Sequence, residues 1–156
     1  MAATAKKPDP SQAARKALTP ILADLIDLSL QGKQAHWNVR GRDFQTVHEQ
    51  LDLIVTAVRL SYDEVAERIV TLGGSADGGA AQIAKGSRLP PFPTGLVSDS
   101  AAVEEILARL DKVVDGLRQG IGELDGVEPV TQDLLIATAA GIEKQAWMLR
   151  AKLSKA

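Results

Sequence analysis

The sequence predicts an all-α protein: a four-helix bundle in which a long crossover joins the second and third helices and carries a short helix of its own. Apolar residues recur at steps of three and four along most of the chain, which is the period of a helix with one buried face. The alternation typical of strands is nearly absent from the sequence. Two connections between the predicted helices are short and one is long, and this pattern determines the topology.

The first predicted helix spans residues 19–38. Thr19 is a suitable N-cap, and Pro20 suits the first helical position, where its missing N–H is not needed. The residues before it, 1–18, begin polar and are predicted to form a basic, partly flexible N-terminal tail. The bundle domain is therefore assigned to residues 19–154.

The second predicted helix begins after Gly41, has Asp43 as its cap and runs to about residue 72. A helix of this length measures about 45 Å. Its apolar residues form one continuous stripe, made of Phe44, Val47, Leu51, Val55, Val58, Tyr62, Val65, Ile69 and Leu72. This stripe identifies the face that packs into the core.

Residues 73–98 hold six of the thirteen glycines and three of the seven prolines, so we expect a long connection, with a short helix near residues 80–85. The third helix ends near Leu124, and Pro129 opens the last helix, which ends near Leu153. Short links make each helix pair an antiparallel hairpin. The long crossover lets the hairpins pack with the second and third helices parallel, which is a ferritin-like arrangement.

Composition excludes several classes of protein. The 156 residues contain no cysteine, which excludes disulfides, thiolate metal sites and cysteine nucleophiles. The formal net charge is −2, so the chain is not a bulk polycation. No apolar run approaches the roughly 18 residues of a membrane span, and the first twelve residues lack the apolar stretch of a signal peptide. We therefore expect a cytoplasmic protein that does not associate with membranes.

Potential metal ligands lie on one side of the second helix, beside the apolar stripe. His48, Asp52, Asp63 and Glu67 fall within an arc of about 100° on a helical wheel, as two pairs with i, i+4 spacing. His36 lies as far before the turn as His48 lies after it, so an antiparallel hairpin places the two at similar height. Mixed imidazole and carboxylate ligands suit Fe(II), Mn or Zn. The geometry of the site decides between these ions.

The two pairs cannot meet within one chain, because His48 and Glu67 are separated by about 28 Å of helix. A two-fold axis between Ala57 and Val58 would set the first pair of one copy opposite the second pair of another. Two composite sites would result, each with two imidazoles and three carboxylates. Leu53, Ala57 and Leu60 form a further apolar strip that such a dimer would bury.

Simpler interpretations exist for each of these residues. A single histidine near a helix end often bonds terminal carbonyl groups, and the three carboxylates could form a solvated face. Glu67 could instead pair with Arg68 or Arg40. Packing is the simpler role for the large aromatic residues, which are Trp37, Tyr62 and Trp147.

The stretch from His36 to Gly74 closely resembles the Dps family, the mini-ferritins of starved bacterial cells. It contains HWNVxGxxF, then H-E-x-x-D, then D-E-x-x-E-R, in order and with the family's spacing. The resemblance extends over about residues 19–150. It implies a hollow shell of twelve subunits with an inter-subunit ferroxidase centre formed by His36, His48 and Asp52 of one subunit and Asp63 and Glu67 of its two-fold mate.

The implied reaction is oxidation of Fe(II) to Fe(III), preferably by hydrogen peroxide, followed by storage of ferric oxide inside the shell and protection of DNA from oxidative damage. Glu49 corresponds to a mineral-nucleating residue on the inner surface. Trp37 resembles an aromatic near the site that takes up stray oxidising equivalents.

Acidic residues near the last turn are candidates for a three-fold iron entry pore, since family members have acidic pore residues in this region. Asp133 is the first candidate, followed by Asp125 and Glu128. The alternative is that these carboxylates stabilise the start of the last helix.

DNA binding is the second predicted function, because many family members bind DNA through lysine-rich tails. Residues 1–20 carry four basic residues, Lys6, Lys7, Arg15 and Lys16, against Asp9, which gives a net charge of +3. Twelve such tails could contact phosphates without sequence preference and associate the shell with the nucleoid. A structural, nucleoid-compacting shell with little ferroxidase activity is therefore the alternative function.

Overall fold

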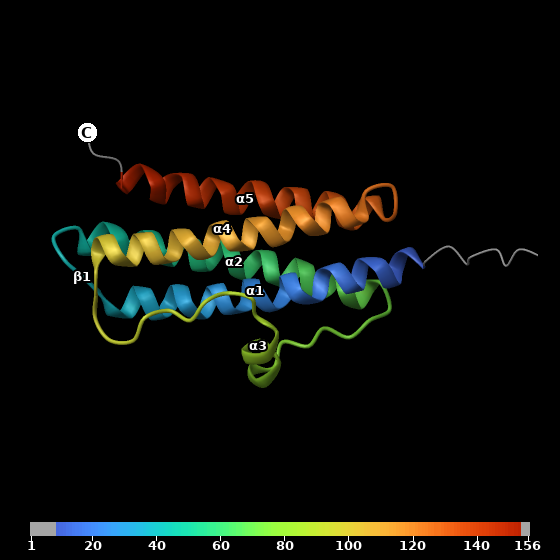
Figure 1. Cartoon of the computed structure of the whole chain (residues 1–156), viewed down its shortest axis with the longest axis horizontal. Helices are drawn as coiled ribbons and strands as arrows, with labels where there is room; N and C mark the ends of the chain where they lie inside the picture. The colour runs from blue at the N-terminus through green and yellow to red at the C-terminus, as the bar shows by residue number, and fades with distance from the viewer. Residues whose placement is uncertain (1–8, 154–156) are drawn as a thin grey trace, which may run out of the picture.

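The computed structural model describes residues 9–153 and confirms the predicted bundle (Figure 1). The described range contains four long helices, α1 (Pro10–Asn38), α2 (Phe44–Thr71), α4 (Asp99–Leu124) and α5 (Pro129–Leu153). The crossover between α2 and α4 carries the short helix α3 (Ala80–Gly86), as predicted. Two short strands, β1 (Val39–Arg40) and β2 (Val97–Ser98), pair in parallel. The helical periodicity gave no sign of this pair.

The start of α1 differs from the prediction. The helix begins at Pro10, where Asp9 is the N-cap and its carboxylate accepts a hydrogen bond from Ser11 N at 3.1 Å. The Asp9-Pro10 pair carries the same cap signal as Thr19-Pro20, and Pro20 lies inside the helix. Thus residues 10–18 are helical, and their apolar side chains enter the core: Ala14, Ala17 and Leu18 are buried.

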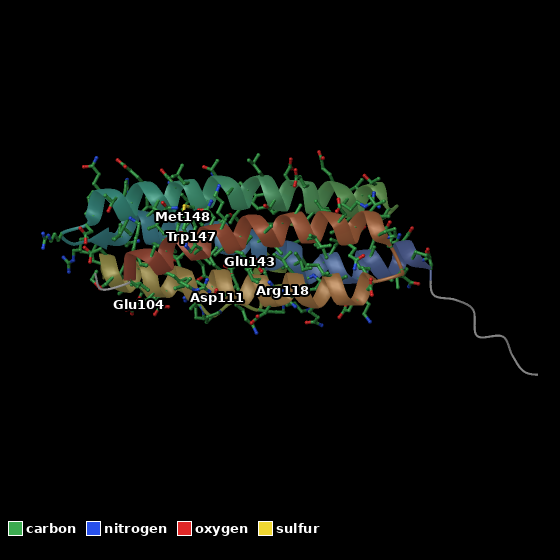
Figure 2. All side chains as sticks on the ribbon, turned by 90° about the horizontal axis from the view of Figure 1, so that it is seen from above. Glu104, Asp111, Arg118, Glu143, Trp147 and Met148 are labelled. Atoms are coloured by element: carbon green, nitrogen blue, oxygen red, sulfur yellow. The ribbon has the colours of Figure 1, made fainter. Side chains whose placement is uncertain are left out.

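The core lies between the two hairpins, α1–α2 and α4–α5. Most of the predicted α2 stripe is buried, from Val47 through Val58 to Ile69. Phe44 at its start is exposed, and Tyr62 is half-buried against the core. The α4–α5 hairpin also has ion pairs at its surface, where Arg118 donates to Glu143 at 2.5 Å (Figure 2). Arg150 pairs with Asp111 on the same hairpin.

The crossover runs along the outer side of α1 from one end of the bundle to the other (Figure 1). Polar side chains of α1 at helical spacing hold it there: Asp24, Asp27, Gln31 and Gln34. Asp24 accepts three hydrogen bonds from Arg88, at 2.8, 2.8 and 2.6 Å. Asp27 accepts from Ser87 Oγ at 2.5 Å, and Gln34 donates to the Pro93 carbonyl at 3.2 Å.

Arg109 of α4 is the centre of this attachment and is only 2% exposed. Its guanidinium donates to Gln31 Oε1 at 2.5 Å, to the Pro91 carbonyl at 2.8 Å and to the Glu105 carboxylate at 2.6 Å. It also lies over the Phe92 ring, 5.4 Å from the ring centroid. One buried side chain therefore joins α1, α4 and the crossover. A buried arginine is stable here because its donors have partners.

A second attachment closes the end of the bundle at the α1–α2 turn. The Asp99 carboxylate, at the start of α4, accepts a hydrogen bond from Asp43 N at 2.8 Å. Backbone hydrogen bonds from Asp43 and Ser100 lower the pKa of Asp99 below its usual value. Gly41 has φ +147°, and a Cβ there would collide with the Asp99 carboxylate. The glycine thus permits a close approach that fixes the turn between α1 and α2.

Replacing Arg109 with methionine is expected to lower the free energy of unfolding by about 3 kcal/mol, because the buried Gln31 side chain and the partly buried Pro91 carbonyl would lose their donor. Urea unfolding at fixed protein concentration measures the change. Arg118→Met is the control, because that arginine side chain is 66% exposed and its ion pair is worth about 1 kcal/mol or less. Equal losses in the two variants would contradict the assigned role of Arg109.

Candidate metal centre

The predicted histidine pair is brought together at the closed end of the α1–α2 hairpin. Nδ1 of His36 lies 2.9 Å from the His48 carbonyl oxygen, and Nδ1 of His48 lies 2.9 Å from the His36 carbonyl oxygen. The two imidazoles stack, with ring centroids 3.5 Å apart and planes at 20°. His36 lies in the last turn of α1, where terminal carbonyl groups lack helical partners. Each histidine therefore ties its own helix to the other one.

These contacts determine which imidazole nitrogens could bind a metal. A carbonyl oxygen only accepts hydrogen bonds, so both Nδ1 atoms must carry the proton. In the neutral rings the lone pair then resides on Nε2, and a hydrogen bond at Nδ1 is the usual second contact of metal-binding histidines. His36 is buried and His48 is half-buried. The pair is thus held in a ligand-ready tautomer.

Asp52 is the third member of this group. Its Oδ1 lies 3.5 Å from His36 Nδ1 and 2.6 Å from the Lys33 ammonium, and its side chain is half exposed. A hydrogen bond from Lys33 lowers the pKa of Asp52 below its usual value. The carboxylate is therefore charged and available to a cation at neutral pH. Sequence reasoning missed Lys33, although its i, i+3 spacing from His36 was a usable signal.

Asp63 and Glu67 lie far from this group on the continuous helix α2, and both are exposed. Nineteen residues separate Glu67 from His48, which corresponds to about 28 Å of helix. Within residues 9–153, no set of three or more His, Asp or Glu side chains gathers closely enough to hold a metal ion. Arg68 was one of two alternative partners predicted for Glu67. In the structure, Arg68 pairs with Glu128 at 3.1 Å.

The second apolar strip of α2 faces solvent in the single chain. Leu53 is 61% exposed and Leu60 is 67% exposed, while Ala57 between them is partly covered. Trp37, next to His36, is 70% exposed, and the Lys33 ammonium lies 5.9 Å from its ring centroid. Glu49 is exposed one residue after His48, where it accepts from Gln45 at 3.0 Å.

The three acidic residues proposed for a pore have different environments. Glu128 is the residue before α5, and its carboxylate accepts hydrogen bonds from Arg68 and from the backbone and hydroxyl of Thr131. Asp125 accepts from Gln132 at 3.3 Å, and Asp133 is exposed on α5, just after its first turn. The Glu128 carboxylate is therefore engaged in holding the start of α5 against α2.

The basic residues predicted to contact DNA are also separated by the structure. Lys6 and Lys7 lie outside the described residues. Arg15 is not part of a tail: it is half-buried in α1 and donates to the Leu72 carbonyl at the end of α2. Lys16 is exposed on the same helix. Within residues 9–153, no helix is long and apolar enough to cross a bilayer.

Comparison with known proteins agrees with the fold. Residues 15–156 match the model of the ferritin-like domain. DNA protection during starvation protein 2 of Deinococcus radiodurans is 38% identical over 138 residues, which are 88% of this chain and 57% of that protein. The Agrobacterium fabrum DNA protection during starvation protein is 34% identical, over 88% of this chain and 86% of the relative.

Solved structures agree as well. The structure titled as Dps from Microbacterium arborescens in the high iron form has a TM-score of 0.91 at 34% identity, and the match covers 98% of this chain and all of that one. The fold thus defines a ferritin-like protein. Within that class, the chain belongs to the Dps family.

Glu128→Gln is expected to cost about 1 kcal/mol at neutral pH, because the Gln amide cannot match the charged acceptor. Partial burial raises the pKa of Glu128, but hydrogen bonds from Thr131 and Arg68 outweigh it and lower that pKa overall. A carboxyl with a lowered folded-state pKa stabilises the fold above its unfolded-state pKa, and this contribution is lost as the pH falls through the folded-state value.

The difference in unfolding free energy between wild type and Glu128→Gln should therefore shrink as the pH falls below the usual glutamate range. Urea titrations from pH 7 to pH 3 measure it. Glu123→Gln, on the exposed side of α4, serves as the control. A difference that stays constant over this range would contradict the assignment.

Proposed function

We propose that the chain is a ferroxidase and iron-storage protein that oxidises Fe(II) to Fe(III) at sites shared between subunits. The observation that carries this proposal is the reciprocal bonding of His36 and His48 through Nδ1, which leaves a lone pair on each Nε2 atom, with the Asp52 carboxylate 3.5 Å from Nδ1 of His36. Family membership and the similar structure titled as a high iron form add support.

The two types of ligand in this proposal favour different oxidation states of iron. Imidazoles of His36 and His48 bind Fe(II), and the carboxylates are hard ligands that favour Fe(III). Lys33 holds Asp52 until an incoming cation displaces its ammonium. One hydrogen peroxide molecule accepts one electron from each of two Fe(II) ions and, with two protons, becomes two waters. Iron and peroxide are consumed together, which suppresses hydroxyl-radical formation. Zinc, with similar ligand preferences, would compete for the site.

A two-fold dimer would complete each site with the partner's Asp63 and the partner's Glu67. Burial of Leu53 and Leu60 would stabilise that dimer. Six such dimers would form a dodecameric shell, with Glu49 nucleating mineral on its inner surface and Asp133 lining an entry pore. The exposure of all six of these side chains in the single chain supports this arrangement.

A His36→Ala/His48→Ala variant is expected to lose rapid iron oxidation, because both imidazole ligands are removed. Anaerobic addition of Fe(II), followed by hydrogen peroxide, produces ferric absorbance that stopped-flow spectroscopy records. The expected loss is at least about 100-fold, the upper range seen when contacts of a metal site are removed. An unchanged rate would refute the assigned site.

Asp133→Asn provides a matched control, because it removes a carboxylate from the same chain at a distance from the histidine pair. It should leave the rate of iron oxidation unchanged when Fe(II) is bound at the site before hydrogen peroxide is added. Sedimentation at equilibrium should give a mass of about twelve chains for every variant. A monomer that keeps full iron affinity would rule out shared sites.

The second candidate function is DNA binding by the shell. The curated relatives bear the name DNA protection during starvation protein, and Lys16 is exposed near the N-terminal end of α1. Against this, Arg15 is committed to the Leu72 carbonyl, which leaves fewer cations for phosphate contacts.

Binding through Lys6, Lys7 and Lys16 should appear as a gel shift that weakens steeply with salt. Replacing these three lysines with glutamine is expected to abolish the shift, while Arg15→Gln has little effect on it. The absence of any shift at low salt would exclude this function without affecting the ferroxidase proposal.

A further inference from the structure

A small cleft opens between α1 and α4, beside the point where the crossover meets both helices. Its cavity volume is about 170 Å³, and residues of all three segments line it. Toward the closed end of the bundle, the crossover covers this side of α1 and α4, where the Pro91 carbonyl accepts from Arg109. In the other direction from Arg88 the groove between the helices is open, and the cleft lies there.

The α4 side of the cleft contains two buried glycines, Gly116 and Gly120. The Arg88 guanidinium lies directly over the first of them, because a Cβ at Gly116 would collide with Arg88 Nη2. A glycine allows this close approach, since it has no side chain. The cleft therefore has a guanidinium at one end and no bulky side chain on the α4 helix beneath it.

Arg88 is held in place by a buried carboxylate. Its Nε and Nη2 donate to Asp24 at 2.8 and 2.6 Å. The Asp24 side chain is 2% exposed, whereas that of Arg88 is 35% exposed. Among the residues that the structure describes, Nη1 of Arg88 has no hydrogen-bond partner. The guanidinium is thus fixed on its inner edge and can still donate to a ligand from its outer edge.

Three exposed lysines surround Arg88: Lys16 of α1, Lys85 of α3 and Lys112 of α4. Lys16 lines the cleft itself. Lys85 lies three residues before Arg88, and Lys112 lies one helical turn, or about 6 Å, before Gly116 on the same face of α4. In the described part of the chain, none of the three lysines forms an ion pair.

The carboxylates near the cleft are engaged elsewhere. Asp24 is bound to Arg88, and Glu123 accepts from the Gln119 amide at 2.8 Å. Asp115 lines a separate groove on the side of α4 that faces α5. The free charges around the cleft are therefore positive, which favours an anionic ligand although the whole chain has a net charge of −2.

The position of the cleft in the bundle makes it accessible to a large ligand. Helix α1 packs against α2 and α4, and α5 packs against the same two helices, so the α1–α4 side lies opposite the α2–α5 side. In the proposed shell, Glu49 of α2 faces the interior. The α1–α4 side, along which the crossover runs (Figure 1), then faces outward.

We infer that this cleft binds a phosphate group of the DNA backbone, with Arg88 and Lys16 as direct contacts and Lys85 and Lys112 beside them. The inference rests on DNA binding, the second candidate function, and adds to the tail a contact surface on the helices. Guanidinium and ammonium groups only donate hydrogen bonds, which suits phosphate oxygens. Contacts to phosphates carry no sequence information, so all DNA sequences should bind alike.

The salt dependence of DNA binding tests the inference, because log K falls with log salt by about 0.9 for each phosphate contact on duplex DNA. Lys85→Gln and Lys112→Gln should each reduce this slope by about 0.9 for every subunit in contact. Lys144→Gln is the matched control, since Lys144 is an exposed lysine on α5, and it should leave the slope unchanged. Circular dichroism and iron oxidation should match wild type in all three variants.

The outcomes separate the cleft from the tail and from the ferroxidase. Wild-type slopes in Lys85→Gln and Lys112→Gln, together with a reduced slope in Lys6→Gln/Lys7→Gln, would overturn the cleft contact and leave DNA binding to the tail. No gel shift of wild type at low salt would overturn the cleft contact together with DNA binding, whereas iron oxidation tests the ferroxidase separately.

Inorganic phosphate alone distinguishes the two sources of a phosphate group. Equilibrium dialysis measures its binding to wild type and to Lys16→Gln. Phosphate binding that Lys16→Gln abolishes, with a salt slope for DNA equal to that of wild type, would assign the cleft to free phosphate and overturn the inference. A reduced salt slope for DNA in Lys16→Gln supports the backbone contact.

Discussion

The reciprocal hydrogen bonds between His36 and His48 fix the register of the α1–α2 hairpin, and the remaining features of the site depend on that register. If α2 slid by one turn, Asp52 would leave the imidazoles and Lys33. The Asp99 contact at Gly41 prevents such a shift by binding the turn to α4. The geometry of the candidate site is therefore set by the backbone of two helices and one turn.

Helix identities, their C-terminal boundaries and the crossover could be predicted from the sequence, because periodicity and capping residues act locally. The start of α1 could not, because Asp9-Pro10 and Thr19-Pro20 carry equal local signals. Burial of Ala14, Ala17 and Leu18 decides between them, and burial is a property of the whole bundle. The pairing of β1 with β2 is likewise long-range, since each strand has only two residues.

The histidine pair was predictable because both residues lie equally far from one short turn. The contacts of Arg109 and Glu128 were not, because each joins elements whose relative heights depend on the crossover. The Arg15 contact lies within the α1–α2 hairpin, but it was missed because α1 was predicted to begin only at residue 19. A charged residue in a sequence is expected to be exposed to solvent, because most charged side chains are. Arg109 departs from that expectation because acceptors from three separate segments converge on it. The pattern Asp24, Asp27, Gln31, Gln34 shows in hindsight that one side of α1 faces a polar neighbour.

The anchored crossover also affects whether copies of this chain can exchange hairpins with one another. A long linker between two hairpins would allow one hairpin to exchange with that of an adjacent molecule, a common hazard when identical chains crowd together. Arg88 and Arg109 bind the linker to the hairpins on both sides of it. Exchange would require both contacts to break first, so they favour a pair of hairpins that closes within one polypeptide.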